Sequence, residues 1–171
     1  MNRTALLIVA ASLAGAAGLQ AQTTNPLIGE MKRAYTQYKG YWTKVAASMP
    51  EENYSFKPVP EIRSFGEMVA HVADHQTSFC SSVTGPRKPG DAATKKTKAD
   101  LVAALAVSYA ECDKAWDNIT DANATEMVGQ RSKLGTLITD VAHSEEEYGY
   151  ISVYLRLSHI VPPSSDRSAG R

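Results

Sequence analysis

Hydrophobic side chains recur every three or four positions along most of this chain, which is the period of an α-helix with one buried face. The pattern predicts four helices, over residues 26–49, 64–84, 97–119 and 134–161. The stripes are formed by Ile28, Met31, Tyr35, Tyr38, Trp42, Val45 and Met49; by Phe65, Met68, Val69, Val72, Phe79 and Val83; by Val102, Leu105, Tyr109, Cys112, Trp116 and Ile119; and by Leu134, Leu137, Ile138, Val141, Tyr148, Ile151 and Leu155. No segment of useful length alternates with period two, so no strand is expected.

Residues that favour helix ends stand at the ends of these stripes. Ser64 and Glu67 have the spacing of a capping box, and Thr97 with Asp100 resembles an N-cap and its acidic partner. The stripes are ended by Pro50, by Gly85 with Pro86, and by Pro162 with Pro163. Four helices with one apolar face each must pack those faces together, so the sequence predicts an all-α four-helix bundle. A long connection over 51–60 leaves the simple up-and-down topology open.

The N-terminal residues have the pattern of an export signal. Arg3 is followed by an uncharged, mostly apolar run over 5–18, and Leu19-Gln20-Ala21 places a small residue at the cleavage position. We predict a cleavable signal peptide over 1–21 and a single domain over 22–171. The protein is then exported, periplasmic or secreted. The apolar run is short for a membrane span, so no membrane association is expected after cleavage.

The charge balance argues against nucleic acid as a partner. Basic and acidic residues number 18 each, and removal of Arg3 with the signal leaves a net charge of −1. Phosphate binding needs a clustered positive excess, and the one basic cluster, Lys95, Lys96 and Lys98, precedes a helix as a solvated linker. The expected partner is a small molecule of unknown identity, and a homodimer is compatible with the bundle.

The chain has two cysteines, Cys80 and Cys112. An even pair in an exported protein is a candidate disulfide, and both residues fall on the inward faces of neighbouring predicted helices. A bridge requires Cα atoms within about 7 Å of one another. The alternative is two buried free thiols that pack as small hydrophobes.

Two short segments carry the candidate chemistry. HVADH (71–75) and HSEEE (143–147) each place two metal-binding residue types four positions apart, on one face of a helix. At roughly 100° per residue, His143 and Glu147 lie more than a right angle from the apolar stripe at Val141, which suits a cleft between helices. Histidine with a carboxylate binds Zn, Ni or Fe, and a two-histidine, one-carboxylate set leaves positions open for catalysis.

On spacing alone, two solvated helix faces are the simpler interpretation of these segments. If a metal site is present, Asp74 and Glu146 are candidates to orient its histidines. Tyr148, Tyr150 and His75 are candidates to carry protons. No residue can be assigned a catalytic role from the sequence.

The segments MPEENYSFKPVPEIRSFGEMVAHVADH (49–75) and HSEEEYGYISVYLRLSHIVPPSS (143–165) resemble the DinB superfamily of metal-binding four-helix-bundle proteins, also called DinB/YfiT-like. The resemblance implies three metal-binding histidines, at His71, at His143 and at position 147, where this chain has Glu147. Three outcomes follow: Glu147 serves as the third ligand, His75 becomes the ligand in its place, or the site is degraded.

The resemblance implies a divalent metal ion, with Zn, Ni and Fe as the candidates, in a cleft between the second and fourth helices. Some family members are similar to metal-dependent thiol transferases or hydrolases, and many have no assigned activity, so a metal-dependent enzyme of one of these kinds is the first hypothesis. The alternative is a non-catalytic metal-binding or structural bundle. A third interpretation is a disulfide-pinned bundle without a ligand.

Overall fold

A computed structural model describes residues 25–168, so the predicted signal peptide lies outside the described residues. Four long helices dominate it, as the periodicity predicts. They are α1 (Pro26–Ser48), α2 (Phe65–Thr84), α3 (Lys98–Asn118) and α4 (Lys133–Leu157). The three short 3₁₀ helices are η1 (Glu51–Asn53), η2 (Ala92–Thr94) and η3 (Pro163–Ser165). The four-helix bundle is therefore confirmed.

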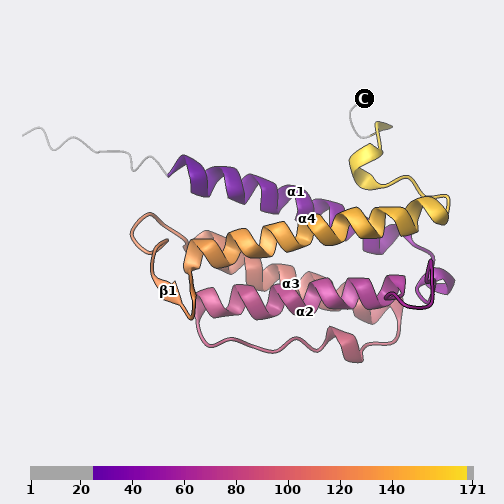
Figure 1. Ribbon diagram of the computed structural model, residues 1–171, viewed down its shortest axis with the longest axis horizontal. Helices are drawn as coiled ribbons and strands as arrows, with labels where there is room; N and C mark the ends of the chain where they lie inside the picture. Colours follow the sequence, from indigo (N-terminus) through magenta and orange to yellow (C-terminus); the bar gives the residue numbers. More distant parts are fainter. Residues whose placement is uncertain (1–24, 169–171) are drawn as a thin grey trace, which may run out of the picture.

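The helices do not alternate in direction. In Figure 1, α1 and α4 run one way along the bundle and α2 and α3 run the other way, and the connection between α2 and α3 returns along its whole length. Contacts join α2 to α3 and α4, and join α1 to α4 and α3. Hence α1 and α2, although consecutive, lie diagonally opposite, and the long connection over 49–64 crosses the end of the bundle between them.

The helix ends follow the local chemistry of the sequence. Ser64 Oγ accepts a hydrogen bond from Glu67 N, and Ser64 N donates to Glu67 Oε2 at 2.6 Å, which completes the predicted capping box of α2. Thr97 caps α3 by accepting from Asp100 N at 3.1 Å. These caps use N–H groups that the helices leave without an internal partner, so they set where α2 and α3 begin.

The expectation that the chain has no strand was wrong in one place. Strands β1 (Met127–Val128) and β2 (Arg131–Ser132) form a two-residue antiparallel ladder, with Met127 opposite Ser132. Gly129 turns the chain with a φ of 66°, which glycine adopts without a steric penalty. A ladder of two residues is too short to show an alternating pattern, so it could not be predicted from hydrophobic periodicity.

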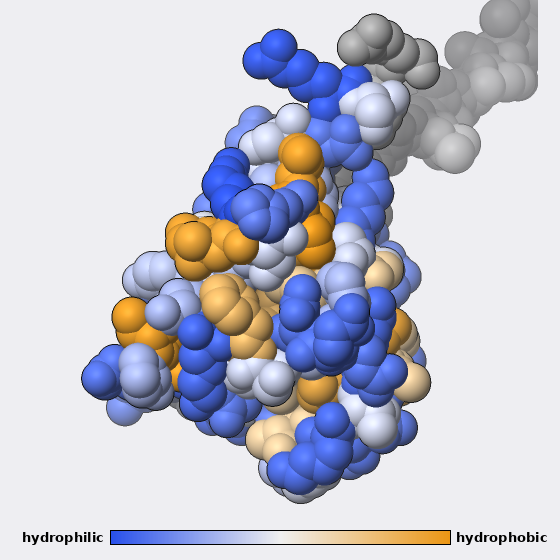
Figure 2. Space-filling view, turned by 90° about the vertical axis from the view of Figure 1, so that its right-hand side faces the viewer, coloured by the Kyte–Doolittle hydropathy of each residue, from blue (hydrophilic) through white to orange (hydrophobic). Residues whose placement is uncertain are grey.

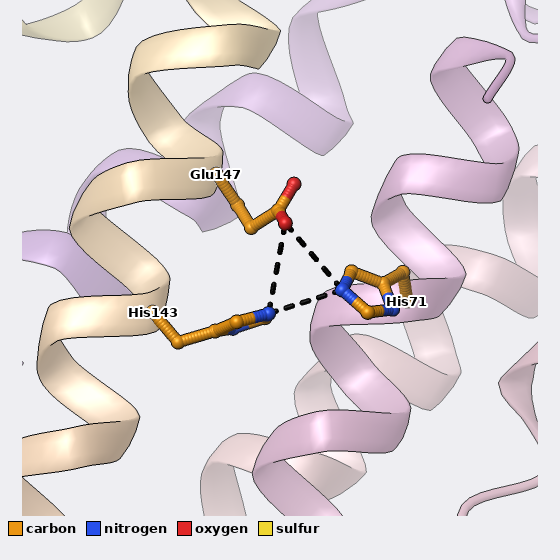
Figure 3. A group of neighbouring side chains, drawn as sticks. All are labelled: His71, His143 and Glu147. Atoms are coloured by element: carbon orange, nitrogen blue, oxygen red, sulfur yellow. Dashed lines mark hydrogen bonds and ion pairs between the residues drawn. The ribbon is translucent and has the colours of Figure 1, made fainter. Parts of the chain in front are cut away.

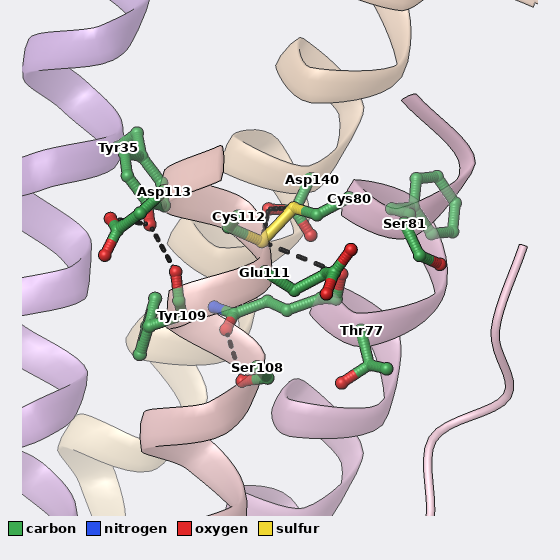
Figure 4. Close-up of a disulfide and its surroundings, with 12 residues drawn as sticks. Tyr35, Thr77, Cys80, Ser81, Ser108, Tyr109, Glu111, Cys112, Asp113 and Asp140 are labelled. Atoms are coloured by element: carbon green, nitrogen blue, oxygen red, sulfur yellow. Dashed lines mark hydrogen bonds between the residues drawn. A yellow bond between two sulfur atoms is a disulfide. The ribbon is translucent and has the colours of Figure 1, made fainter. Parts of the chain in front are cut away.

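The core lies along the axis of the bundle and is filled by large side chains. Those with almost no exposure include Trp42, Trp116, Phe65, Leu105, Leu137 and Ile151. Trp42 Nε1 donates to Ser144 O at 3.1 Å, which ties α1 to α4. Cys80 of α2 and Cys112 of α3 are joined as a disulfide with a Cα–Cα distance of 4.8 Å (Figure 4). Both half-cystines are fully buried.

The surface mixes polar and apolar groups. Figure 2 views the end of the bundle that carries the 49–64 connection, and shows hydrophobic patches separated by hydrophilic side chains. Exposed large hydrophobics of the segments at this end are Val59, Ile62 and Val161. Among the helices of residues 25–168, none has the length and apolarity that crossing a membrane requires.

Candidate metal centre

Three polar side chains converge between α2 and α4 (Figure 3). His71 projects from the second turn of α2, and His143 and Glu147 project from successive turns of α4. The Nε2 atoms of the two histidines lie 3.0 Å apart. Glu147 Oε1 lies 3.5 Å from His71 Nε2 and 3.6 Å from His143 Nε2. We call these three residues the open group.

These separations suit three donors around one cation. A point equidistant from atoms 3.0, 3.5 and 3.6 Å apart lies about 2.0 Å from each, which falls in the bonding range of Zn²⁺ to imidazole nitrogen and carboxylate oxygen. The second oxygen of Glu147, Oε2, is buried without a hydrogen-bond partner in the described protein, and an ion bound by both carboxylate oxygens would satisfy it. The residues therefore fit a divalent metal.

The open group is more enclosed than a helical wheel of α4 alone predicts. The side chain of His71 is 30% exposed, that of His143 17% and that of Glu147 9%. The reason is the packing of α4, which contacts α2 on one side and α1 on the other, so both flanks of its apolar stripe are covered. His71 is left as the most exposed member of the group.

Burial sets the protonation of the group. Desolvation lowers the pKa of His143 to about 3, with further lowering from the charges of His75, His71 and Arg63. It also lowers the pKa of His71 and raises that of Glu147. Both imidazoles are therefore neutral near pH 7, when a nitrogen lone pair can bind a metal. Their contacts with Glu147 are those of converging donors and not of ion pairs.

His75 lies beside the open group but outside the set of converging donor atoms. Its ring stacks on that of His143, with centroids 3.7 Å apart and an interplanar angle of 11°. Its Nδ1 lies 3.2 Å from Asp140 Oδ1. The structure thus brings the carboxylate of Glu147, and not the imidazole of His75, into the group of converging donor atoms.

The carboxylates that the sequence suggested as orienting groups have other partners. Asp74 accepts from Ala92 N at 2.7 Å and from Ala93 N at 3.1 Å, so it anchors the connection before α3. A side chain at Gly90 would overlap Asp74, which explains the glycine there. Glu146 accepts from Tyr150 Oη at 3.2 Å on the surface. The carboxylate that contacts the His75 ring is Asp140, which sequence reasoning missed.

The tyrosines of α4 have structural partners. Tyr148 stacks on Tyr41 and accepts a hydrogen bond from Ser164 N at 2.8 Å. Tyr154 donates to Arg63 O at 2.7 Å, which fixes the connection in front of α2. Tyr150 is 55% exposed. Packing and hydrogen bonding account for these three side chains without a proton-transfer role.

A second group of metal-binding residue types lies deeper in the bundle. It consists of Cys80, Cys112 and Asp140, whose ligand atoms also lie within 4.8 Å of one another and are all buried. We call it the bridged group, because the two sulfur atoms are already joined to each other. A disulfide sulfur has no thiolate charge to offer a metal, so this group does not form a metal site while the bridge is intact.

A cleft of about 940 Å³ opens beside His71. Its walls come from the connection over 51–64, the first turns of α2 and residues 93–96. His71 is the member of the open group that lines it, together with the charged side chains of Lys57, Glu61 and Arg63. A small molecule in this cleft would meet the open group from the side of His71.

The fold and the open group together define an all-α bundle with a candidate metal centre between its second and fourth helices. The chain belongs to the DinB superfamily, whose family model matches residues 34–144. The match covers His71 and His143 and ends before Glu147. A comparison with curated proteins finds no match.

The fold is also similar to that of a solved structure, a DinB-like protein from Bacillus cereus. The TM-score is 0.64 and the sequence identity 17%, over 80% of this chain and 95% of the other. At that identity the likeness concerns the fold.

Proposed function

We propose that this chain binds one divalent metal ion through His71 Nε2, His143 Nε2 and the carboxylate of Glu147. The observation that carries the proposal is the common distance of about 2.0 Å from these donor atoms to a single point. Two neutral imidazoles and one carboxylate suit Zn, Ni or Fe(II). Export through the predicted signal peptide belongs to the same proposal.

The proposed activity is metal-dependent hydrolysis or thiol transfer. A metal with open positions lowers the pKa of a bound water or thiol, which supplies a nucleophile near neutral pH. The protein holds the donors on two helices, and a cleft opens beside His71. Membership of the DinB superfamily agrees with this proposal but does not identify a substrate.

A non-catalytic bundle is the second candidate. It is favoured by the structural partners of Tyr148 and Tyr154, which leave no evident proton carrier on α4 beside Glu147. In this case the metal, if bound, stabilises the packing of α2 against α4. The two candidates differ in turnover, and not in the ligand set.

Metal analysis of the purified mature protein tests the shared claim. We expect about one equivalent of Zn, Ni or Fe in the wild type and little in His71→Ala or His143→Ala. His159→Asn is the matched control, because His159 is exposed and asparagine tolerates its φ of 59°. Equal, near-zero metal in all four proteins after reloading would contradict the proposal. Hydrolysis or thiol transfer that chelator abolishes would then separate the enzyme from the bundle.

A further inference from the structure

The His75 ring lies in a stack of three aromatic rings. Phe79 covers one face, with centroids 4.0 Å apart at 18°, and His143 covers the other, 3.7 Å apart at 11°. Phe79 and His75 come from successive turns of α2, whereas His143 comes from α4. The His75 ring is therefore stacked between the two other rings, and the His143 ring packs flat against it.

Asp140 fixes the orientation of the His75 ring. Its carboxylate is 1% exposed, and Oδ1 lies 3.2 Å from His75 Nδ1. With Asp140 ionised, Nδ1–H donates to Oδ1, which sets the rotation of the ring about its own axis. Asp140 also stands one turn before His143 on α4, so the helix that carries the ligand carries the group that orients its neighbour.

His75 is the one hydrogen-bond donor to this carboxylate in the described protein. The other oxygen, Oδ2, lies 3.8 Å from Sγ of both Cys80 and Cys112 (Figure 4). Bridged sulfur atoms carry no proton, so these are packing contacts and not hydrogen bonds. The disulfide therefore blocks one side of Asp140, and its single polar partner lies on the other.

We propose that Asp140 and His75 are positioning residues that hold the His143 imidazole in the orientation that directs Nε2 at His71 and Glu147. The role in metal affinity rests on the proposed function, but the orientation itself is a property of the metal-free protein. His75 acts through ring contact with His143, and Asp140 acts through its bond to His75. Neither residue touches the metal.

Four variants separate this role from the alternatives. His75→Ala removes the stacked ring, whereas His75→Phe keeps a flat ring between Phe79 and His143 but cannot bind a metal. Asp140→Ala removes the acceptor of Nδ1–H, whereas Asp140→Asn keeps an oxygen there. The matched control is Thr136→Ala, one turn earlier on α4, where the buried hydroxyl donates to Ser132 O at 2.9 Å.

Two measurements are made on each protein. Co²⁺ titration, followed by the visible absorption of the bound ion, gives affinity and coordination geometry. NMR of the metal-free protein gives the His143 ring-proton shifts, which report the stacked His75 ring. We expect His75→Ala and Asp140→Ala to weaken Co²⁺ binding by about 10–100-fold and to shift the His143 signals. His75→Phe and Asp140→Asn should stay close to the wild type in affinity.

The outcomes are distinguishable. Wild-type affinity and unchanged His143 signals in His75→Ala and Asp140→Ala would overturn the inference while leaving metal binding intact. Equal weakening by Thr136→Ala would reduce the effect to general packing and overturn it as well. If His75→Phe loses binding as fully as His75→Ala, His75 is a ligand and not a positioning residue. If the wild type binds no Co²⁺, the proposed function fails, and the NMR shifts alone decide whether His75 and Asp140 orient the ring.

Discussion

The open group and the bridged group both include residues of α2 and α4 but use them in opposite ways, and the bridged group adds Cys112 of α3. Each combines a carboxylate of α4 with metal-binding residue types that include one from α2, and in each the ligand atoms lie within 4.8 Å of one another. The open group is partly exposed, at 30% for His71, whereas every member of the bridged group is at most 1% exposed. In the open group the imidazole and carboxylate donors are free to bind a cation, whereas in the bridged group the two sulfurs are bonded to each other and carry no thiolate charge.

The difference shows how one bundle can use one group of residues to stabilise the fold and another to bind a ligand. The bridged group joins α2 to α3 inside the core, where a covalent bond restricts the unfolded chain. The open group lies next to a cleft, where solvent and ligands have access. His75 and Asp140 connect the two, since Asp140 contacts the disulfide on one side and His75 on the other. Residue types alone do not distinguish the groups; exposure and bonding do.

The largest effect expected is on folding stability when the bridge is removed. The double variant Cys80→Ala, Cys112→Ala should lose about 2–4 kcal/mol of unfolding free energy, because the unfolded chain regains the freedom that the disulfide removes. Urea unfolding of metal-free protein measures it. An unchanged midpoint, or a wild type that melts alike with and without reductant, would show that the bridge does not stabilise the fold.

Removal of a ligand from the open group should weaken metal binding strongly and change the unfolding free energy little. His71→Ala is expected to weaken metal binding by about 100-fold or more, since loss of a direct ligand exceeds the cost of losing an outer hydrogen bond. The unfolding free energy without metal should change by about 0.5 kcal/mol or less, as for other partly exposed side chains. Calorimetric titration and urea unfolding give the two values. A stability loss as large as that of the cysteine variant would remove the distinction between the groups.

Variants at position 147 test whether the side chain of this residue binds the metal. Glu147→Gln should weaken binding by about tenfold, because the amide lacks the charge that a divalent ion attracts. Glu147→His supplies the histidine that the family resemblance implies at this position and should keep binding while shifting the preference toward Ni and Zn over Mn. Competition between metals measures the shift. The same selectivity in the wild type and in Glu147→His would mean that residue 147 does not contact the ion.

The smallest effect concerns pH in the metal-free protein. Burial lowers the pKa of His143 to about 3, against an ordinary value of 6.5, so below pH 6.5 the unfolded chain takes up a proton that the native state does not. Stability from this residue is complete above pH 6.5 and declines as pH falls, by about 1 kcal/mol between pH 6 and pH 5. The raised pKa of Glu147 acts with the opposite sign, in the pH window between its ordinary value of 4.5 and its raised value. His143→Gln, unfolded in chelator, should show a shallower pH dependence than the wild type, and equal slopes would contradict a buried neutral imidazole.

The helices could be predicted because each signal is local. The stripes, the Ser64–Glu67 box and the prolines act within a few residues, and the bounds of α1, α2 and α3 lie within one residue of the prediction. Helix α4 ends at Leu157, four residues before the predicted end at 161, and His159 then has a left-handed φ of 59°. The convergence of His71 with His143 could not come from either helix alone, since it depends on α2 packing against α4 across 72 positions of sequence. Resemblance to the family supplied that pairing.

The role of Asp140 went unseen for a different reason. It stands one position before Val141 in an apolar stripe, and a carboxylate there is recognised as buried only when its neighbours are known. Asp74 and Glu146, inside the two histidine segments, were the obvious candidates, but both bond elsewhere. A lone acid on the inward face of α4, one turn before His143, was the signal that could have identified Asp140.

Anomalous X-ray diffraction from crystals loaded with Zn²⁺ shows directly whether His71, His143 and Glu147 bind one shared ion. The account predicts one strong peak between α2 and α4, about 2.0–2.2 Å from His71 Nε2, His143 Nε2 and a carboxylate oxygen of Glu147. No peak at saturating metal, or a peak bound by other side chains with these three left apart, would contradict it.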